Sequence, residues 1–300
     1  MRKVVEVAGR RLSLSNLEKD LYPSYGFTKA QILEYYRRIC PFILPHLKGR
    51  ALTLKRYPEG VEKEYFFEKR CPSHRPTWVE TTEVLLHDGE RMTFCVVNDL
   101  NALMWVQNLA SLELHVPLAR AGSPERPDSM VFDLDPGDQA DVLDCARVAF
   151  TLRNLLADLG LTCYVKTSGQ KGLHVFVPLN TDGVTFDRTK QFSKTVAEVL
   201  QRSYPDQITS KVAKEQRKKR VFINWAQNDD AKTMICVYSL RAREKPTVSF
   251  PLGWEELQDL ADRGDPARFQ VIHSEALTRA ERDGDPFREV LVKKQKLPYL

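Results

Sequence analysis

Residues 129–137 read Ser-Met-Val-Phe-Asp-Leu-Asp-Pro-Gly, a stretch with the apolar character of a buried strand. Alternate residues of a strand point to the same face, so Asp133 and Asp135 project together while the apolar residues between them face the core. Two unpaired carboxylates on a buried strand repel each other, which favours a divalent cation between them. Oxygen ligands favour Mg²⁺ or Mn²⁺. The alternative is a strand that ends in an acidic turn.

A second motif, Thr167-Ser-Gly-Gln-Lys-Gly172, separates two predicted strands. Its glycines free the backbone to direct amides toward an anion, while Ser168 offers a hydroxyl and Lys171 a cation, as a phosphate requires. His174 alternates with valines in the second strand, so it projects away from them and can face a site. By itself such a loop is also an ordinary hairpin turn. Combined with the paired carboxylates, it indicates a nucleotidyl-transfer centre.

Six motifs follow one another in a recognisable order. They are Leu54-Lys-Arg-Tyr-Pro58, Tyr65-Phe-Phe-Glu-Lys69, Leu112-Glu-Leu-His115, Phe132-Asp-Leu-Asp-Pro136, Thr167-Ser-Gly-Gln-Lys-Gly-Leu-His-Val175 and Tyr238-Ser-Leu-Arg-Ala242. This series resembles the polymerase domain of bacterial ligase D, of the archaeo-eukaryotic primase superfamily, over about residues 14–254. The resemblance implies a template-directed nucleotidyltransferase that adds nucleotides, preferably ribonucleotides, at DNA ends and gaps during non-homologous end joining. It also implies Mn²⁺ or Mg²⁺ as cofactor, and nucleoside triphosphates, DNA with a downstream 5′-phosphate, Ku and a DNA ligase as partners.

The resemblance also implies roles for individual residues. Nucleotide or template contacts are implied for Ser168, Lys171, His174, Lys55, Arg56, His115 and Arg241. The pocket for a downstream 5′-phosphate is implied for Asn16, Lys19 and Lys29, and stacking on template bases for Phe66 and Phe67. Aromatic faces accept any base and lysines accept phosphates without reading sequence, so these residue types suit such roles. For the Phe-Phe pair the alternative is core packing.

The third metal position departs from the family pattern. The family has an aspartate before an aromatic residue on this strand, whereas this chain has Asn224 before a tryptophan. An amide offers a metal a carbonyl oxygen but brings no charge and cannot act as a base. We therefore expect Asp133, Asp135 and Asn224 to form the catalytic metal set, with nucleotide binding better preserved than chemistry. Asp229 and Asp230, in the polar turn that follows, could in principle compensate.

Asn224 supports an alternative function, a weakly catalytic or non-catalytic module that binds DNA ends. A primase that starts chains without a primer is a third possibility, because the superfamily includes such enzymes. Phosphatases that begin with Asp-x-Asp fit less well, since Gly137 stands where they have Thr or Val. A metal-dependent glycosyltransferase would not account for the loop that begins at Thr167.

Lys19 and Lys29 have a reading that needs no resemblance. Thr28 and Gln31 form a capping box, so Lys29 lies in the first turn of a predicted helix, and the N-terminus of a helix favours a bound phosphate. No carboxylate partner is evident between the two lysines. The alternative is a pair of solvated surface lysines.

Composition and charge fit a nucleic-acid partner without requiring one. The chain has 300 residues, 42% of them hydrophobic, and a formal net charge of +5. Residues 211–220 contain six cations and one acid. Such a run is usually a solvated loop, but beside a polymerase centre it becomes a candidate clamp on template or primer phosphates.

The cysteines and the hydropathy predict the cellular compartment. The six cysteines, at positions 40, 71, 95, 145, 163 and 236, have no Cys-x-x-Cys spacing and are expected to be reduced, mostly buried thiols. No signal-peptide pattern and no apolar run long enough to span a bilayer is present. We expect a cytoplasmic, nucleoid-associated protein without a membrane partner.

The predicted elements indicate an α+β fold. Helices are expected at about 28–44, from the cap Asn98 to 109, at 140–159, at 186–203 and after a last cap at Asp285-Pro286. Strands are expected at 51–57, 91–97, 111–116, within 129–137, and at 161–166 and 173–178. Strands gathered around a site with helices outside them indicate α+β or mixed α/β rather than a doubly wound nucleotide fold. The resemblance implies an α+β fold with a primase-like core of mixed or antiparallel sheets. We expect one compact domain, 1–300, with a DNA-end-binding part at about 1–120, a catalytic part at about 121–255 and a C-terminal helical tail at about 256–300.

Overall fold

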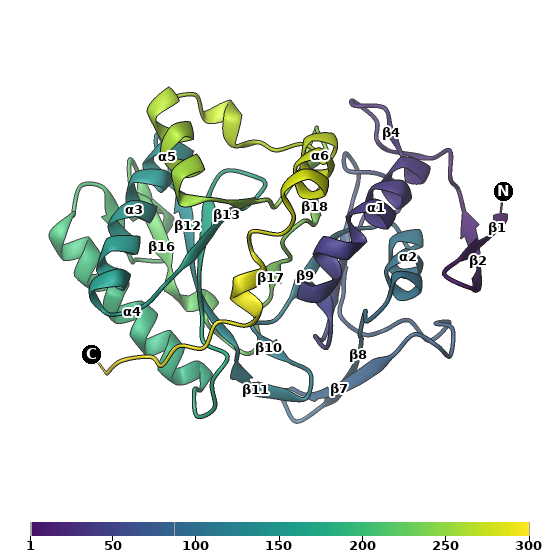
Figure 1. Cartoon of the computed structure of the whole chain (residues 1–300), viewed down its shortest axis with the longest axis horizontal. Helices are drawn as coiled ribbons and strands as arrows, with labels where there is room; N and C mark the ends of the chain where they lie inside the picture. Colours follow the sequence, from purple (N-terminus) through teal and green to yellow (C-terminus); the bar gives the residue numbers. More distant parts are fainter. Residues whose placement is uncertain (1, 87, 300) are drawn as a thin grey trace. The chain divides into compact units, whose positions relative to one another are not determined.

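The structure, a computed structural model, describes residues 2–86 and 88–299 (Figure 1). The chain forms two compact units. The first consists of Met1–Gly122, Thr233–Ser249 and Ile272–Gly284, and the second of Ser123–Lys232, Phe250–Val271 and Asp285–Leu300. The chain first passes from the first unit to the second between Gly122 and Ser123, near the predicted boundary at about residue 120. The predicted C-terminal part, from about residue 256 onward, is divided between the two units.

The first unit is built on an antiparallel sheet with the strand order β17-β9-β5-β6. Its strands are β17 (Met234–Ile235), β9 (Ser111–Val116), β5 (Thr53–Arg56) and β6 (Phe66–Glu68). Helices α1 (Lys29–Leu47) and α2 (Leu100–Asn108) pack against each other, and α2 contacts β9. Ile32, Tyr36 and Ile39 recur at helical spacing on α1 and are buried, and the Tyr36 hydroxyl donates a hydrogen bond to the carbonyl of Leu112.

Short hairpins and one further helix complete the first unit. They are β1 (Arg2–Val7) with β2 (Arg10–Ser15), β3 (Asp20–Tyr22) with β4 (Phe27–Thr28), β7 (Thr81–Leu85) with β8 (Arg91–Cys95), β18 (Leu240–Arg241) with β19 (Thr247–Val248), and α6 (His273–Asp283). Strands β10 (Ala119–Arg120) and β11 (Ser123–Pro127) lie where the chain passes to the second unit.

The second unit contains the larger sheet, in the order β15-β16-β12-β14-β13-β20. Its strands are β15 (Ile208–Thr209), β16 (Val221–Asn224), β12 (Ser129–Pro136), β14 (Leu173–Pro178), β13 (Tyr164–Thr167) and β20 (Pro251–Leu252). Only β15 and β16 pair in parallel among these strands. Helices α3 (Val142–Asp158) and α4 (Phe186–Ser203) pack against the central strand β12, and α5 (Trp254–Arg263) packs against α3 (Figure 1). Single turns of 3-10 helix are η1 (Lys214–Arg217), η2 (Trp225–Gln227), η3 (Pro266–Phe269) and η4 (Arg288–Leu291).

The predicted fold class is confirmed, because the chain combines helices with mainly antiparallel sheets. The capping box is also confirmed, since the Thr28 side chain accepts from the Gln31 amide and the Gln31 side chain accepts from the Thr28 amide. Within residues 2–86 and 88–299, no helix is both long and apolar enough to cross a lipid bilayer.

Two predicted helix caps are wrong. The N-cap of α2 is Asp99, whose carboxylate accepts from the Ala102 amide at 2.7 Å, whereas Asn98 accepts from the Gly49 amide. Asn and Asp are comparable caps, so sequence alone does not choose between neighbours. Asp285 caps no α-helix: it accepts from the Phe287 amide in a turn that leads into η4.

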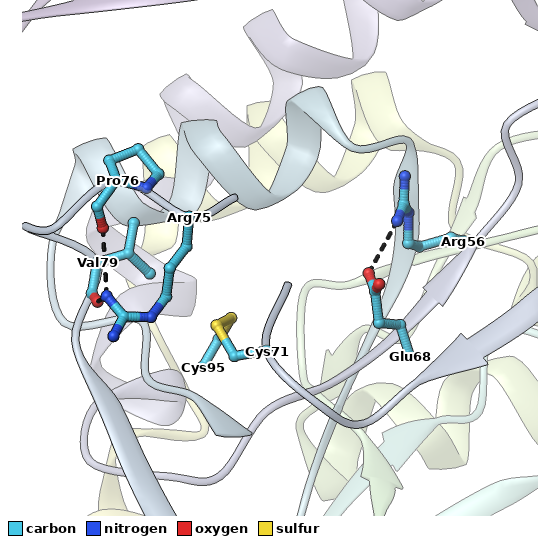
Figure 2. Close-up of a disulfide and its surroundings, with 7 residues drawn as sticks. All are labelled: Arg56, Glu68, Cys71, Arg75, Pro76, Val79 and Cys95. Carbon is cyan, nitrogen blue, oxygen red and sulfur yellow. Dashed lines mark hydrogen bonds and ion pairs between the residues drawn. A yellow bond between two sulfur atoms is a disulfide. The ribbon is translucent and has the colours of Figure 1, made fainter. Parts of the chain in front are cut away.

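The prediction that every cysteine is a free thiol is wrong for one pair. Cys71 and Cys95 form a disulfide across a separation of 24 residues (Figure 2). The other four cysteines are buried and form no disulfide. Thr81 also pairs with Cys95 in the β7–β8 hairpin. Segment 71–81 is therefore joined to Cys95 at both ends, by the disulfide at Cys71 and by strand pairing at Thr81. Within that segment, the Arg75 guanidinium donates to the carbonyls of Pro76 and Val79 (Figure 2).

Removing the disulfide is expected to lower the stability of the protein. A closed loop of this length restricts the unfolded chain, which stabilises the fold by about 3 kcal/mol. The double variant Cys71→Ser, Cys95→Ser should therefore show a lower free energy of unfolding in urea. A dithiol reductant should produce the same loss in the parent and none in the variant. Equal stability of parent and variant under oxidising conditions would contradict the expected role.

Candidate functional site

Four polar side chains form a row across the sheet of the second unit. Asp133 on β12 lies opposite His174 on β14 and Asn224 on β16, and Lys166 on β13 lies opposite His174. Directly opposed residues of antiparallel strands project from the same face. The Asn224 amide donates to Asp133 Oδ2 at 3.1 Å, and His174 Nε2 lies 3.3 Å from Asp133 Oδ1. At the end of the row, Lys166 Nζ lies 2.9 Å from His174 Nδ1.

Asp135 lies beside this row, two residues beyond Asp133 on the same strand. Burial raises the pKa of Asp135 to about 7, the Asp133 carboxylate adds to the rise, and the Arg217 guanidinium opposes it. The two carboxylates therefore carry more negative charge than their surroundings balance. A divalent cation bound by their oxygens would relieve the repulsion, so these residues fit Mg²⁺ or Mn²⁺.

The third position of the set weakens this metal site. In the part of the chain that the structure describes, no group of three or more His, Cys, Asp or Glu side chains is placed to hold a metal. The expected set has only two carboxylates because its third member is Asn224. The amide nitrogen of Asn224 faces Asp133, which leaves its carbonyl oxygen as the atom that a metal could use. Asp229 forms an ion pair with Lys190 of α4 at 2.6 Å, so its carboxylate is engaged there.

The loop from Thr167 to Gly172 is closed by its own serine. Ser168 Oγ accepts hydrogen bonds from the amides of Gln170 and Gly172, both at 3.1 Å, and the Ser168 amide donates to the Gly172 carbonyl. A Cβ at Gly172 would lie 2.1 Å from the Leu134 carbonyl oxygen, so only glycine lets the loop lie against β12. Lys171 is exposed at the loop. These contacts hold Ser168, Lys171 and His174 in one short stretch of the second unit.

The basic run at residues 211–220 is an exposed segment that contains η1. Gly137 packs against it so closely that a Cβ there would lie 1.8 Å from the Arg217 carbonyl oxygen. The Arg217 guanidinium carbon lies 3.8 Å from the centre of the Phe222 ring. The segment therefore brings a cation toward Asp135, and its contact with nucleic acid stays a prediction.

In the first unit, three of the expected nucleotide contacts surround one buried carboxylate, Glu113. Its oxygens lie 3.0 Å from His115 Nε2, 3.6 Å from Arg241 Nε and 3.8 Å from Lys55 Nζ. Burial alone would raise the pKa of Glu113, but the His115 hydrogen bond and the Arg241 and Lys55 charges outweigh it and hold the pKa at about 2. Lys55 Nζ also lies 4.0 Å from the centre of the exposed Tyr65 ring.

Arg56 does not join this cluster, because it follows Lys55 in the strand and points to the other face of the sheet. Arg56 donates to Glu68 at 2.9 Å and to the Leu109 carbonyl at 2.8 Å (Figure 2). The phenylalanines divide in the same way. Phe67 lies opposite Lys55 and Phe66 opposite Arg56, so the two rings extend from opposite faces of β6. They are 53% and 44% exposed, which excludes core packing for both.

The residues expected to hold a 5′-phosphate line one pocket of the first unit. Asn16, Lys19, Lys29 and Arg56 border this cavity of about 690 Å³, and the described residues that line it include no aspartate or glutamate. Lys29 is only 4% exposed, and its Nζ donates to the Ser15 carbonyl at 2.7 Å. Burial lowers the pKa of Lys29 to about 8, and the Arg56 and Lys19 charges contribute.

Lys19 differs from the expectation in one respect. Its Nζ lies 2.7 Å from a carboxylate oxygen of Glu59, so the lysine has an acidic partner that the sequence did not reveal. Glu59 does not line the pocket, and its side chain is 69% exposed. The solvated-surface alternative fails for Lys29, which is buried.

Sequence reasoning missed two residues that the structure places in these clusters. Glu113 stood within a quoted motif together with His115, but it carried no expected role because its cationic neighbours, Lys55 and Arg241, come from distant segments. Lys166 was read as an ordinary strand residue. A signal was present, because Lys166 stands between a valine and a threonine of a strand, and both neighbours are buried. A lysine in such a place needs a polar partner.

The paired carboxylates on a mixed sheet, with a phosphate-type loop on the adjacent strand, define a domain of the nucleotidyl-transfer class. The family described as LigD, primase-polymerase domain, matches residues 28–287. The multifunctional non-homologous end joining DNA repair protein LigD of Mycobacterium tuberculosis (strain ATCC 25618 / H37Rv) is 39% identical over 284 residues, which cover 92% of this chain and 36% of that protein. The bifunctional non-homologous end joining protein LigD of Bacillus subtilis (strain 168) is 33% identical over 277 residues, 92% of this chain and 44% of that protein.

A solved structure agrees with this match. The polymerase domain from Mycobacterium tuberculosis ligase D in complex with DNA has a TM-score of 0.87 and 38% identity, and the match covers 95% of this chain and 99% of that one. The chain belongs to the LigD primase-polymerase domain family. It spans between about a third and a half of the length of these two LigD relatives.

Proposed function

We propose that the chain is a metal-dependent, template-directed nucleotidyltransferase that adds nucleotides at DNA ends and gaps during non-homologous end joining. The observation that carries the proposal is the Asp133–Asp135 pair, two carboxylates on the strand next to His174, where a cation would relieve their repulsion. Two relatives carry non-homologous end joining in their names, and the matched structure is described as a complex with DNA.

Each group of residues has a separate task in this proposal. Asp133, Asp135 and the Asn224 carbonyl would hold the divalent ion, Mn²⁺ or Mg²⁺, which when bound neutralises triphosphate charge and lowers the pKa of the primer hydroxyl. In the second unit, Ser168, Lys171 and His174 bind the triphosphate. In the first unit, the side chains around Glu113, which are Lys55, His115 and Arg241, bind nucleotide or template, and the exposed Phe66 and Phe67 stack on bases.

Asn224 favours a second candidate, a DNA-end-binding module with weak chemistry. Its amide supplies no negative charge at the metal site. The amide also donates a hydrogen bond to Asp133 Oδ2, an oxygen that a metal would need. The cations of the 5′-phosphate pocket do not depend on Asn224, so DNA-end binding would survive the loss of chemistry.

Extension of a recessed DNA end separates these functions. The purified chain is incubated with Mn²⁺ and each ribonucleotide or deoxynucleotide, with template and primer present, and again with the primer omitted. The proposal predicts templated, primer-dependent extension. Products formed without a primer would instead establish a primase. Absence of products, together with 5′-phosphate-dependent DNA binding, would establish the binding module.

Loss of Lys19 and Lys29 is expected to abolish recognition of the downstream 5′-phosphate. Charge-assisted contacts are worth about 1.5–3 kcal/mol each, so the double variant Lys19→Ala, Lys29→Ala should bind phosphorylated gapped DNA roughly a hundredfold more weakly. Affinity is measured for the same gapped duplex with and without its 5′-phosphate. The matched control is Arg37→Ala, Arg38→Ala, which removes two cations from the exposed side of α1. A parent protein indifferent to the phosphate would rule out the pocket.

Ribonucleotides are expected to be preferred over deoxynucleotides. Such a preference requires a polar partner for the 2′-hydroxyl, which a deoxynucleotide leaves unpaired at a cost of about 1–3 kcal/mol. Incorporation of ATP and dATP is compared on one template at equal concentrations. Equal rates would contradict the preference.

The partners in this proposal follow from the same assignment. They are nucleoside triphosphates, gapped duplex DNA with a 5′-phosphate, Ku and a DNA ligase. A pull-down that compares binding of the chain to Ku-bound DNA ends and to free DNA ends tests the contact with Ku.

A further inference from the structure

We propose that Lys166 is a positioning residue that fixes the proton of His174 on Nε2 and so directs an N–H group toward a phosphate oxygen of the bound nucleotide. The inference rests on the proposed function, because it assigns His174 a nucleotide phosphate as its partner. Lys166 itself is placed two strands away from the paired carboxylates and is not a metal ligand.

The contact between Lys166 and His174 fixes the direction of the hydrogen bond. Lys166 Nζ lies 2.9 Å from His174 Nδ1. With Lys166 as an ammonium, which has only donors, Nδ1 is the acceptor and carries no proton. A neutral imidazole with an unprotonated Nδ1 carries its proton on Nε2. Nε2 is the atom that faces Asp133 Oδ1, at 3.3 Å.

The burial of both side chains makes this arrangement persistent. Lys166 is 1% exposed and His174 is 5% exposed, so water does not compete freely for their polar atoms. Lys166 Nζ also lies 5.8 Å from the centre of the Phe176 ring, on the same strand as His174. Because the four residues of the row project from adjacent strands at one level, the imidazole is held between its two neighbours.

The proton on Nε2 matters because an anion is the group expected in front of it. In the protein alone the N–H faces the Asp133 carboxylate. A cation held by Asp133 would occupy that carboxylate, and an oxygen of the triphosphate would then be the acceptor for the Nε2 proton. The opposite tautomer would present a lone pair to the phosphate, and two acceptors repel.

The experiment has a spectroscopic arm that needs no activity. The chain is labelled with ¹⁵N-histidine, and the imidazole nitrogens are observed by NMR at a pH where the ring is neutral, with His174→Gln used for assignment. We expect the parent to show a protonated Nε2 and an unprotonated Nδ1 for His174. The variant Lys166→Met should show a mixture of tautomers, and Lys166→Arg, which keeps donors, should restore the parent pattern. The control Lys190→Met removes a lysine of the same unit that pairs with Asp229, and should leave the His174 signals unchanged.

The second arm measures binding of ATP with Mn²⁺ by calorimetry. Lys166→Met should weaken ATP binding about tenfold or more, as expected for a misdirected charge-assisted hydrogen bond, and should raise KM more than it lowers kcat. Lys190→Met should bind like the parent. A parent spectrum with the proton on Nδ1 would overturn the inference, even if Lys166→Met does not fold. Unchanged ATP affinity in Lys166→Met would overturn it as well. A parent that does not bind ATP would instead refute the proposed function, whatever the tautomer.

Discussion

Replacing Asp133 or Asp135 by alanine is expected to reduce metal-dependent nucleotide addition to background. The two carboxylates project from one face of β12, and Asn224 supplies no charge that could replace either of them. Each single variant therefore leaves one carboxylate for a cation that needs several oxygen ligands. The measurement is extension of a recessed DNA end across a range of Mn²⁺ concentrations. Retained extension in both single variants would remove these residues from the metal site.

Two controls separate this loss from misfolding. The pocket proposed for the 5′-phosphate lies in the first unit, so affinity for phosphorylated gapped DNA should stay close to that of the parent in both variants. The second control is the free energy of unfolding of the variants. The pKa of Asp135 is raised in the fold to about 7, above its ordinary value of 3.8. An acid with a raised pKa destabilises the fold as pH rises, with no cost below about pH 4 and the full cost above about pH 7.

The pH dependence of the free energy of unfolding tests directly whether the pKa of Asp135 is raised in the fold. Without divalent ions, Asp135→Asn should be more stable than the parent at pH 8 and similar to it at pH 4. Urea unfolding at the two values measures the difference. Addition of Mn²⁺ should stabilise the parent and leave Asp135→Asn nearly unchanged. A stability difference between the parent and Asp135→Asn that is the same at both pH values would show that burial and the Asp133 carboxylate do not raise the pKa of Asp135 in the fold.

Asn224→Asp is expected to raise the rate of nucleotide addition by orders of magnitude. The change restores a third carboxylate opposite Asp133, and each tenfold in rate corresponds to about 1.4 kcal/mol of barrier. Nucleotide affinity should change much less, since Ser168, Lys171 and His174 are untouched. Single-turnover extension, with ATP affinity measured separately, distinguishes the two effects.

The same substitution should have an opposite effect on the metal-free protein. Asn224 now donates to Asp133 Oδ2, and an aspartate there would replace that hydrogen bond by repulsion. Asn224→Asp should therefore be less stable than the parent without divalent ions and regain stability when Mn²⁺ is added. Asn224→Ala is the matched control, which loses the hydrogen bond without gaining charge and should be no faster than the parent. If the parent already extends as fast as Asn224→Asp, the third acid is dispensable in this chain.

Features set by local sequence were predicted well. The spacing of Asp133 and Asp135 fixes a shared face in any strand, and helix α4 begins and ends at the predicted Phe186 and Ser203. The capping box of Thr28 and Gln31 is likewise a matter of neighbouring residues. Periodicity and capping act over a few residues, so they can be read before the fold is known. Errors of one residue, as at Asn98 and Asp99, arise where two good caps are adjacent.

The sequence by itself determined the carboxylate pair, the loop beside it, the α+β class and the resemblance to a family. Only the tertiary structure decided the row of Lys166, His174, Asp133 and Asn224, because it depends on the register of the β13–β14 hairpin, β12 and β16, which are far apart in the chain. The same holds for the contacts of Glu113 with Lys55 and Arg241 and for the disulfide. Strand order and register are set by packing of the whole sheet, and no local pattern encodes which distant residue a side chain will face.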